Sequence, residues 1–129
     1  MLKKEKITIE YQFNKVSKTI LWKCLSSSNG LGEWFADKVD DTNNEFVFTW
    51  ENHHQTATLM TQKEGVFVRF HWNEEPEDTY FEFSIHTIEL TGDVGLTITD
   101  FVEVDERDDA IRLWNAQIDN LRRAAGMSF

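Results

Sequence analysis

The chain has 129 residues, and its 13 Lys and Arg against 23 Asp and Glu give a formal charge of −10. A chain of this length buries enough surface for a core without disulfides or metals, so we expect one domain over residues 1–129. The acidic balance argues against a protein that binds nucleic-acid phosphates and against a basic membrane anchor. Aromatic residues make up 13% of the chain and provide large apolar side chains for the core.

The N-terminal residues carry charges with no apolar segment behind them, and no run in the chain approaches 18 apolar residues. Signal peptides and membrane-spanning helices need such segments, so we expect a cytoplasmic protein without membrane insertion. Cys24 is the single cysteine, which excludes an intrachain disulfide. Its neighbours Leu21 and Leu25 indicate a buried, structural thiol.

A strand and a helix are predicted for the first part of the chain. Apolar and polar residues alternate from residue 7 to residue 13, which is typical of a strand with one buried face. Asn14 or Ser17 can cap the helix that follows, which is expected to end near residue 26.

A second short helix and a long run of strands are expected next. Leu31, Trp34 and Phe35 lie at positions i, i+3 and i+4, which predicts a helix of one or two turns. Residues 38–104 lack this periodicity and are interrupted by turn-forming clusters, as antiparallel hairpins are. The clusters lie at residues 40–44, 51–52, 63–65, 73–78 and 91–93, and apolar alternation predicts strands at 46–50, 66–72 and 81–85.

Two changes in this alternation predict irregular strands. The apolar positions change from odd to even numbers after residue 85, and from even to odd after residue 98. One inserted residue moves every later side chain of a strand to the other face. We therefore expect bulges near His86 and Asp100.

A long C-terminal helix is predicted to begin among the acidic residues of positions 105–109, because carboxylates stabilise the positive end of a helix. Gly126, preceded by two arginines, is typical of a helix end. The apolar residues recur at helical spacing and form one stripe: Ile111, Trp114, Ile118, Leu121 and Ala125. We expect this stripe to pack on the sheet.

Four motifs in this order resemble the START-like (SRPBCC) superfamily, and most closely its Hsp90-ATPase-activator-homologue branch. They are Leu21-Trp22-x-x-Leu25-Ser26 with Leu31-x-x-Trp34-Phe35, then Val68-Arg69-Phe70-His71-Trp72, Leu96-Thr97-Ile98-Thr99-Asp100-Phe101, and Trp114-x-x-x-Ile118-x-x-Leu121. The resemblance implies an α+β helix-grip fold. In this fold a curved antiparallel sheet of about six to seven strands wraps around the long C-terminal helix, with two short helices after the first strand.

The resemblance also implies a cavity between the long helix and the sheet, which relatives use for lipids or other apolar molecules. The wealth of large aromatic residues is consistent with such a cavity, and equally with plain core packing. The candidate lining residues are Trp34, Phe35, Phe48, Trp50, Phe70, Trp72, Phe83, Trp114, Gln117, Ile118 and Leu121. Gln117 is the polar residue near the inward stripe, so it either anchors a ligand or satisfies a buried carbonyl.

Catalytic and metal-binding patterns are weak in this sequence. His53 and His54 are adjacent, so on a strand they point to opposite faces and do not share a metal easily. Glu82 and Asp100 form an acid/base pair only if the changes in alternation turn both into the cavity. We expect no metal, no cofactor and no catalytic residues.

Three functions remain open. The favoured one is a non-enzymatic module that binds a hydrophobic small molecule. Between residues 70 and 109 every charged residue except Arg107 is acidic, which favours as an alternative a docking face for a basic partner, such as a chaperone. The third is a cyclase or hydrolase, which requires a polar catalytic group in the cavity. The sequence is compatible with a monomer or a homodimer.

Overall fold

The computed structural model describes residues 4–126, and in this range seven strands form one antiparallel sheet. The strands are β1 (Lys4–Phe13), β2 (Lys38–Thr42), β3 (Glu45–Trp50), β4 (His53–Lys63), β5 (Phe67–Trp72), β6 (Phe81–Thr87) and β7 (Val94–Glu103). The helices are α1 (Lys18–Ser26), α2 (Ser28–Leu31), the 3-10 turn η1 (Val104–Glu106) and α3 (Arg107–Gly126). The strand order is β1-β7-β6-β5-β4-β3-β2, so the first strand closes one edge beside the last.

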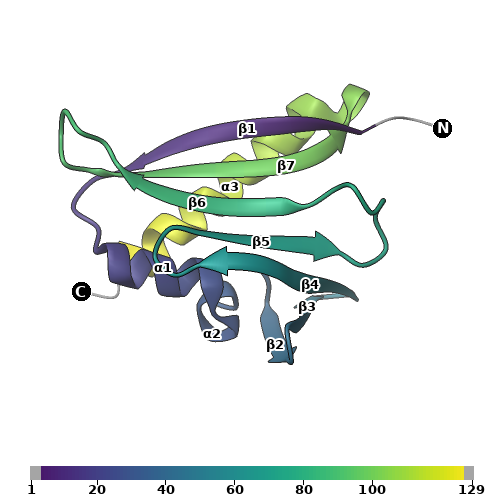
Figure 1. The fold of residues 1–129 in the computed structure, drawn as a ribbon. Coiled ribbons are helices and arrows are strands. Elements are labelled where there is room, and N and C mark those ends of the chain that lie inside the picture. The colour runs from purple at the N-terminus through teal and green to yellow at the C-terminus, as the bar shows by residue number, and fades with distance from the viewer. Residues whose placement is uncertain (1–3, 127–129) are drawn as a thin grey trace.

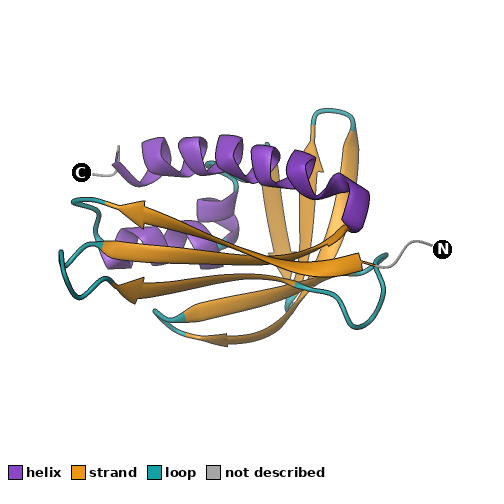
Figure 2. Ribbon diagram, turned by 90° about the horizontal axis from the view of Figure 1, so that it is seen from above, coloured by secondary structure: helices purple, strands orange, loops and turns teal. Residues whose placement is uncertain are grey.

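The sheet curves around the long helix (Figure 1). Figure 2 shows α3 lying across one face of the sheet. In the same view β2 and β3 run at a steep angle to β1 and β7. The buried residues of α3 are Trp114, Ile118, Leu121 and Ala125, four of the five members of the predicted stripe. The predicted helix-grip α+β architecture is therefore confirmed.

The predicted bulges near His86 and Asp100 are wrong. The pairing of β7 with both β1 and β6 runs without a shift along the paired residues. The first change in alternation arises because Ile88 lies beyond the end of β6. The second arises because Phe101 turns to the outer face, where its ring lies 5.0 Å from that of Tyr80.

An irregularity occurs instead in β4, where the register with β5 shifts between Leu59 and Thr61. Met60 lies at the shift and its side chain is 53% exposed. A residue inserted at this point bends the strand and increases its local twist.

The second predicted helix is present as a single turn, but it lies earlier in the chain than expected. It ends at Leu31, so Trp34 and Phe35 lie in the turns that connect α2 with β2. Gly30 fixes this arrangement, because a side chain there would approach the Lys23 carbonyl oxygen to 2.0 Å. Because α2 packs closely against the end of α1, the residues that follow α2 are directed into the interior of the protein.

The turn expected over residues 40–44 is shorter than predicted. The chain continues as β2 to Thr42, and Asn43 and Asn44 alone make the connection to β3, with φ angles of 48° and 69°. Two adjacent residues with positive φ form the hairpin turn that matches the twist of the strands, and asparagine tolerates this conformation. This turn lets β2, which contains no aromatic residue, pair with β3 at the edge of the sheet.

Candidate functional site

The interface between α3 and the sheet is filled by aromatic rings, with Phe35 at its centre. The Phe35 ring stacks on Trp114 at 5.9 Å and on Trp72 at 6.4 Å between ring centroids. It also meets Phe48 edge to face at 5.4 Å. Phe35 is 5% exposed, so a side chain from the loop after α2 occupies the middle of the predicted cavity.

Most of the other predicted lining residues belong to this packed core. The fully or almost fully buried ones, at 6% exposure or less, are Phe48, Phe70, Phe83, Trp114, Ile118 and Leu121. Their rings pack in the edge-to-face and offset geometries that aromatic pairs prefer. These six residues contribute packing and shape rather than an accessible surface.

An open pocket of about 750 Å³ lies beside this core, and we call it the loop–helix pocket. One wall is the connection between α2 and β2, and the opposite wall is the C-terminal half of α3. The lining residues are Gly32, Glu33, Trp34, Phe35, Ala36, Asp37, Trp50, Gln117, Asn120, Arg123 and Ala124. Four of the predicted residues therefore meet there: Trp34, Phe35, Trp50 and Gln117.

Hydrogen bonds hold the aromatic wall of the loop–helix pocket in place. The indole N–H of Trp34 donates to the carbonyl oxygen of Cys24 at 2.7 Å, and that of Trp50 donates to the Phe35 carbonyl at 3.1 Å. Burial raises the pKa of the Cys24 thiol to about 11, with the nearby Glu33 charge acting in the same direction. The thiol beneath this wall is therefore protonated and unreactive at neutral pH.

The polar wall of the loop–helix pocket extends beyond Gln117. Asn120 and Arg123 follow it at intervals of three residues, so all three lie on one side of α3, and the Arg123 guanidinium donates to the Asn120 side-chain oxygen. The sequence analysis missed these two residues, although their helical spacing from Gln117 was the signal that could have found them. Glu33 and Asp37 face them across the pocket.

A second, smaller pocket of about 190 Å³ lies at the other end of the sheet, and we call it the sheet-end pocket. Its lining residues are Lys4, Gln55, Trp72, Glu75, Thr79, Tyr80, Asp100 and Phe101. Asp100 lies on the face of β7 that carries Val94, Leu96 and Ile98, and so it points inward without any bulge. Trp72, the remaining predicted lining residue, belongs to this pocket.

The Asp100 carboxylate is held by two donors. The indole N–H of Trp114 donates to its Oδ2 atom at 2.9 Å, and the backbone N–H of Phe101 donates to its Oδ1 atom at 2.8 Å. Burial raises the pKa of Asp100, while both hydrogen bonds and the Lys4 charge oppose that rise. Glu82 points to the outer face instead and accepts a hydrogen bond from Arg69 Nε at 2.8 Å, so the two carboxylates do not form an acid/base pair.

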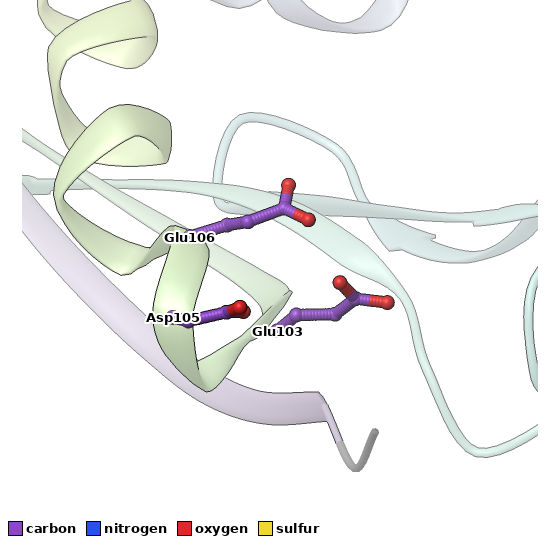
Figure 3. A group of neighbouring side chains, drawn as sticks. All are labelled: Glu103, Asp105 and Glu106. Atoms are coloured by element: carbon purple, nitrogen blue, oxygen red, sulfur yellow. The ribbon is translucent and has the colours of Figure 1, made fainter. Parts of the chain in front are cut away.

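Two further groups of side chains, the histidine pair and an acidic group, are candidate metal ligands. His53 stacks on Trp50, whereas His54 Nδ1 lies 2.9 Å from Thr49 Oγ1, so the pair does not converge. Figure 3 shows the carboxylates of Glu103, Asp105 and Glu106 on one side of η1, with ligand atoms within 4.8 Å of one another.

This carboxylate group is a surface feature. Asp105 and Glu106 are exposed. A hydrogen bond with Glu103 raises the pKa of Glu106, and the Glu103 and Asp105 charges act in the same direction. Carboxylates in an acidic surface cluster repel one another in this way whether or not a metal ion is bound.

These features define the protein as an α+β helix-grip domain with an aromatic core and two pockets at its ends. A family model for the START-like superfamily domain matches residues 1–127, so the chain belongs to this superfamily. Among curated proteins none matches the chain.

Solved structures extend the comparison. A Bacteroides fragilis protein solved by solution NMR is 45% identical, with a TM-score of 0.68 over 95% of this chain and 91% of that one. The Aha1 dimer from Colwellia psychrerythraea has a TM-score of 0.78 at 16% identity, over 94% of this chain and 96% of that one. A Bacillus halodurans protein has a TM-score of 0.74 at 17% identity, over 97% and 99% of the two chains. The last two show likeness of fold.

None of the helices within residues 4–126 combines the length and the apolar character that crossing a membrane requires.

Proposed function

We propose that the protein binds a hydrophobic small molecule in the loop–helix pocket and acts as a binding module rather than an enzyme. The observation that carries the proposal is that two walls of different chemistry face each other across this pocket. Trp34, Phe35 and Trp50 lie on the aromatic wall, and Gln117 lies on the polar wall. Ligand sites are commonly concave surfaces of about 300–1,000 Å³ with aromatic walls and a few polar groups. The pocket volume of about 750 Å³ lies within that range.

The two walls suggest how such a ligand lies. Its apolar part contacts the half-buried indole of Trp50, beside the buried Trp34–Phe35 pair, whose rings lie 5.3 Å apart. A polar end of the ligand reaches Gln117 or Asn120, whose amides offer both donors and acceptors. Membership of the START-like superfamily, whose fold commonly binds hydrophobic ligands, supports a ligand of this chemical class.

A ligand panel of dodecanoic acid and 1-naphthol tests the proposal through tryptophan fluorescence and thermal unfolding. Binding to the native state quenches fluorescence and raises the melting temperature with ligand concentration. Ala124→Trp fills the pocket and should abolish both effects, whereas Ala116→Trp adds the same ring to an exposed position of α3 and should retain them. No effect on the wild-type protein across a wider lipid and aromatic panel would contradict the proposal.

A second candidate function is the docking of a basic partner at one end of the molecule. Lys4 forms an ion pair with Glu75 in the loop between β5 and β6 and pairs in the sheet with Glu103, so this loop and η1 lie at the same end. Figure 1 shows them together beside the start of β1. The exposed carboxylates gathered there are Glu74, Glu77, Asp78, Asp105 and Glu106. Such a concentration of one charge steers partners of the opposite charge.

An oligolysine peptide of ten residues tests this second candidate by NMR titration at low and high salt. We expect shifts confined to residues 73–80 and 103–106, lost as the salt concentration rises. Glu77→Lys with Asp78→Lys should weaken the binding, whereas Asp41→Lys on the far edge strand serves as the matched control. Equal binding by both variants would refute an acidic docking end.

A further inference from the structure

Asp100 is an unusual residue for its position. The inward side chains of β7 before it are Val94, Leu96 and Ile98, and Val102 follows it, so one carboxylate interrupts an apolar stripe. Placing a carboxylate in such surroundings costs free energy, and it is tolerated where hydrogen bonds or a cation compensate. Asparagine would avoid that cost, but it offers one acceptor oxygen where Trp114 and Phe101 supply two donors. Two acceptor oxygens, and with them the carboxylate, are therefore used at this position.

The two donors leave acceptor capacity on Asp100. An ionised carboxylate offers about four lone-pair sites, and Trp114 and Phe101 use two of them. Asp100 lines the sheet-end pocket, so its remaining capacity is available to a group that enters there. A second carboxylate, that of Glu75, lines the same pocket.

The occupant that the structure already shows in this region is an ammonium group. The Lys4 Nζ atom forms an ion pair with Glu75, and the Lys4 charge also acts on Asp100. The Lys4 side chain is 26% exposed and belongs to the first described residue of an edge strand. A lysine stem is flexible and can swing into solvent without disturbing the strand.

The walls of the pocket favour a cation as well. Trp72, Tyr80 and Phe101 line it, and aromatic rings attract cations through their electron-rich faces. Tyr80 already shows this property on its outer side, where the Arg69 guanidinium lies 3.9 Å from the ring centroid. Two carboxylates, the inward residue Trp72 and a volume of about 190 Å³ describe a site for a small alkylammonium group.

We propose that the sheet-end pocket is a binding site for a small primary amine in its protonated form, and that Lys4 fills the site when no amine is bound. The ammonium group of the ligand takes the place of that of Lys4 beside Glu75 and uses the free acceptor capacity of Asp100 in the same pocket. Its short alkyl part lies against Trp72. This site is separate from the loop–helix pocket and does not depend on the function proposed there.

Chemical rescue tests this site. Lys4→Ala removes the internal occupant, so n-butylammonium chloride should bind the variant saturably and raise its melting temperature. The readout of position is the indole N–H resonance of Trp114, which reports on Asp100 through their hydrogen bond. The wild-type protein should bind the amine at least about tenfold more weakly, because Lys4 competes. Sodium chloride at equal ionic strength and n-butanol should have no such effect.

Two further variants make the test decisive. Lys6→Ala removes the same charge from the next outward position of β1, and it should bind the amine as weakly as the wild type. Asp100→Asn in the Lys4→Ala background should abolish the rescue. The proposal is overturned if the Lys4→Ala protein shows no saturable shift of the Trp114 resonance. Equal shifts with n-butanol, or amine binding that survives Asp100→Asn, would overturn it as well.

Discussion

The two pockets differ in how the chain builds them. The loop–helix pocket is large, and one of its walls is a connection whose residues 32–37 lie outside regular structure. The sheet-end pocket is about a quarter of that volume, and strands β1, β4, β5 and β7 supply most of its lining. Walls made of strands change shape less readily than walls made of loops. The larger pocket is therefore suited to adaptable apolar contacts and the smaller one to a fixed polar contact.

A pair of stacked rings separates the two pockets. Phe35 lines the loop–helix pocket, Trp72 lines the sheet-end pocket, and their ring centroids lie 6.4 Å apart at an interplanar angle of 17°. The difference between the pockets thus depends on one loop residue that inserts into the core. Three substitutions test this comparison, one at the ring pair and two at the sheet-end pocket.

Phe35→Ala should have the largest effect. Replacing a fully packed phenylalanine by alanine removes its ring contacts and leaves a cavity, which costs about 3–5 kcal/mol of the free energy of unfolding. Urea unfolding followed by circular dichroism measures the loss. Because the cavity connects the two pockets, 1-naphthol should stabilise the alanine variant more than it stabilises the wild type.

Phe67→Ala is the matched control for this prediction. Phe67 is half-buried at the start of β5 and lies outside the network of rings around Phe35. We therefore expect a loss of about 1 kcal/mol of the free energy of unfolding and no new response to 1-naphthol. A loss at Phe35 no larger than that at Phe67 would show that the partition between the pockets rests on other residues. Phe35→Leu, which leaves a smaller cavity, keeps the comparison measurable if the alanine variant does not fold.

The fold was predictable because its signals are local and repeated. The period-two alternation of apolar residues predicted the strands, and the apolar stripe predicted that α3 packs on the sheet. The two bulges were predicted wrongly because the alternation of apolar residues was taken as the inward face throughout. On β7 the inward position belongs to Asp100, and the apolar Phe101 faces outward toward Tyr80. An inward carboxylate and an outward, half-buried ring thus reverse the expected pattern at these two positions, and only tertiary contacts show the reversal.

Asp100→Asn should have an intermediate effect that depends on pH. Burial raises the pKa of Asp100 above its ordinary value of 3.8, so the native state holds this proton more strongly than the unfolded state. Asp100 therefore contributes stability below about pH 4, and this contribution is lost as the pH rises through the native pKa. Asparagine keeps one acceptor for two donors, which costs about 1–3 kcal/mol when one N–H stays unpaired.

The free energies of unfolding of the wild type and of Asp100→Asn should consequently converge with rising pH. The variant should be the less stable protein near pH 4, and the gap should narrow toward pH 7. Asp119→Asn, at an exposed position of α3, is the control and should show no comparable convergence. A gap that widens with pH would mean that the ionised carboxylate is well compensated in the native state, so that burial does not dominate at this site.

The candidate site was less predictable than the fold. The sequence places aromatic residues on the inward face, but it does not show that Phe35 fills the space they surround. Gln117 was found because it is polar beside an apolar stripe. Lys4 and Glu75, which lie 71 positions apart, meet only through the pairing of β1 with β7 and the loop after β5. Contacts of this range follow from topology and not from local periodicity.

Arg69→Met should have the smallest effect and should act on one pocket alone. Its guanidinium pairs with Glu82 and covers the outer side of Tyr80, but its side chain is 35% exposed, so solvent screens both interactions. We expect a loss of about 0.5–1 kcal/mol in urea unfolding that decreases at high salt. Methionine keeps the apolar stem against Tyr80, so the pocket wall stays in place. Binding of n-butylammonium to the Lys4→Ala protein should change by less than about threefold, and binding at the loop–helix pocket should not change. An equal loss of binding at both pockets would show that they respond as one unit, because Arg69 touches only the wall of the smaller one.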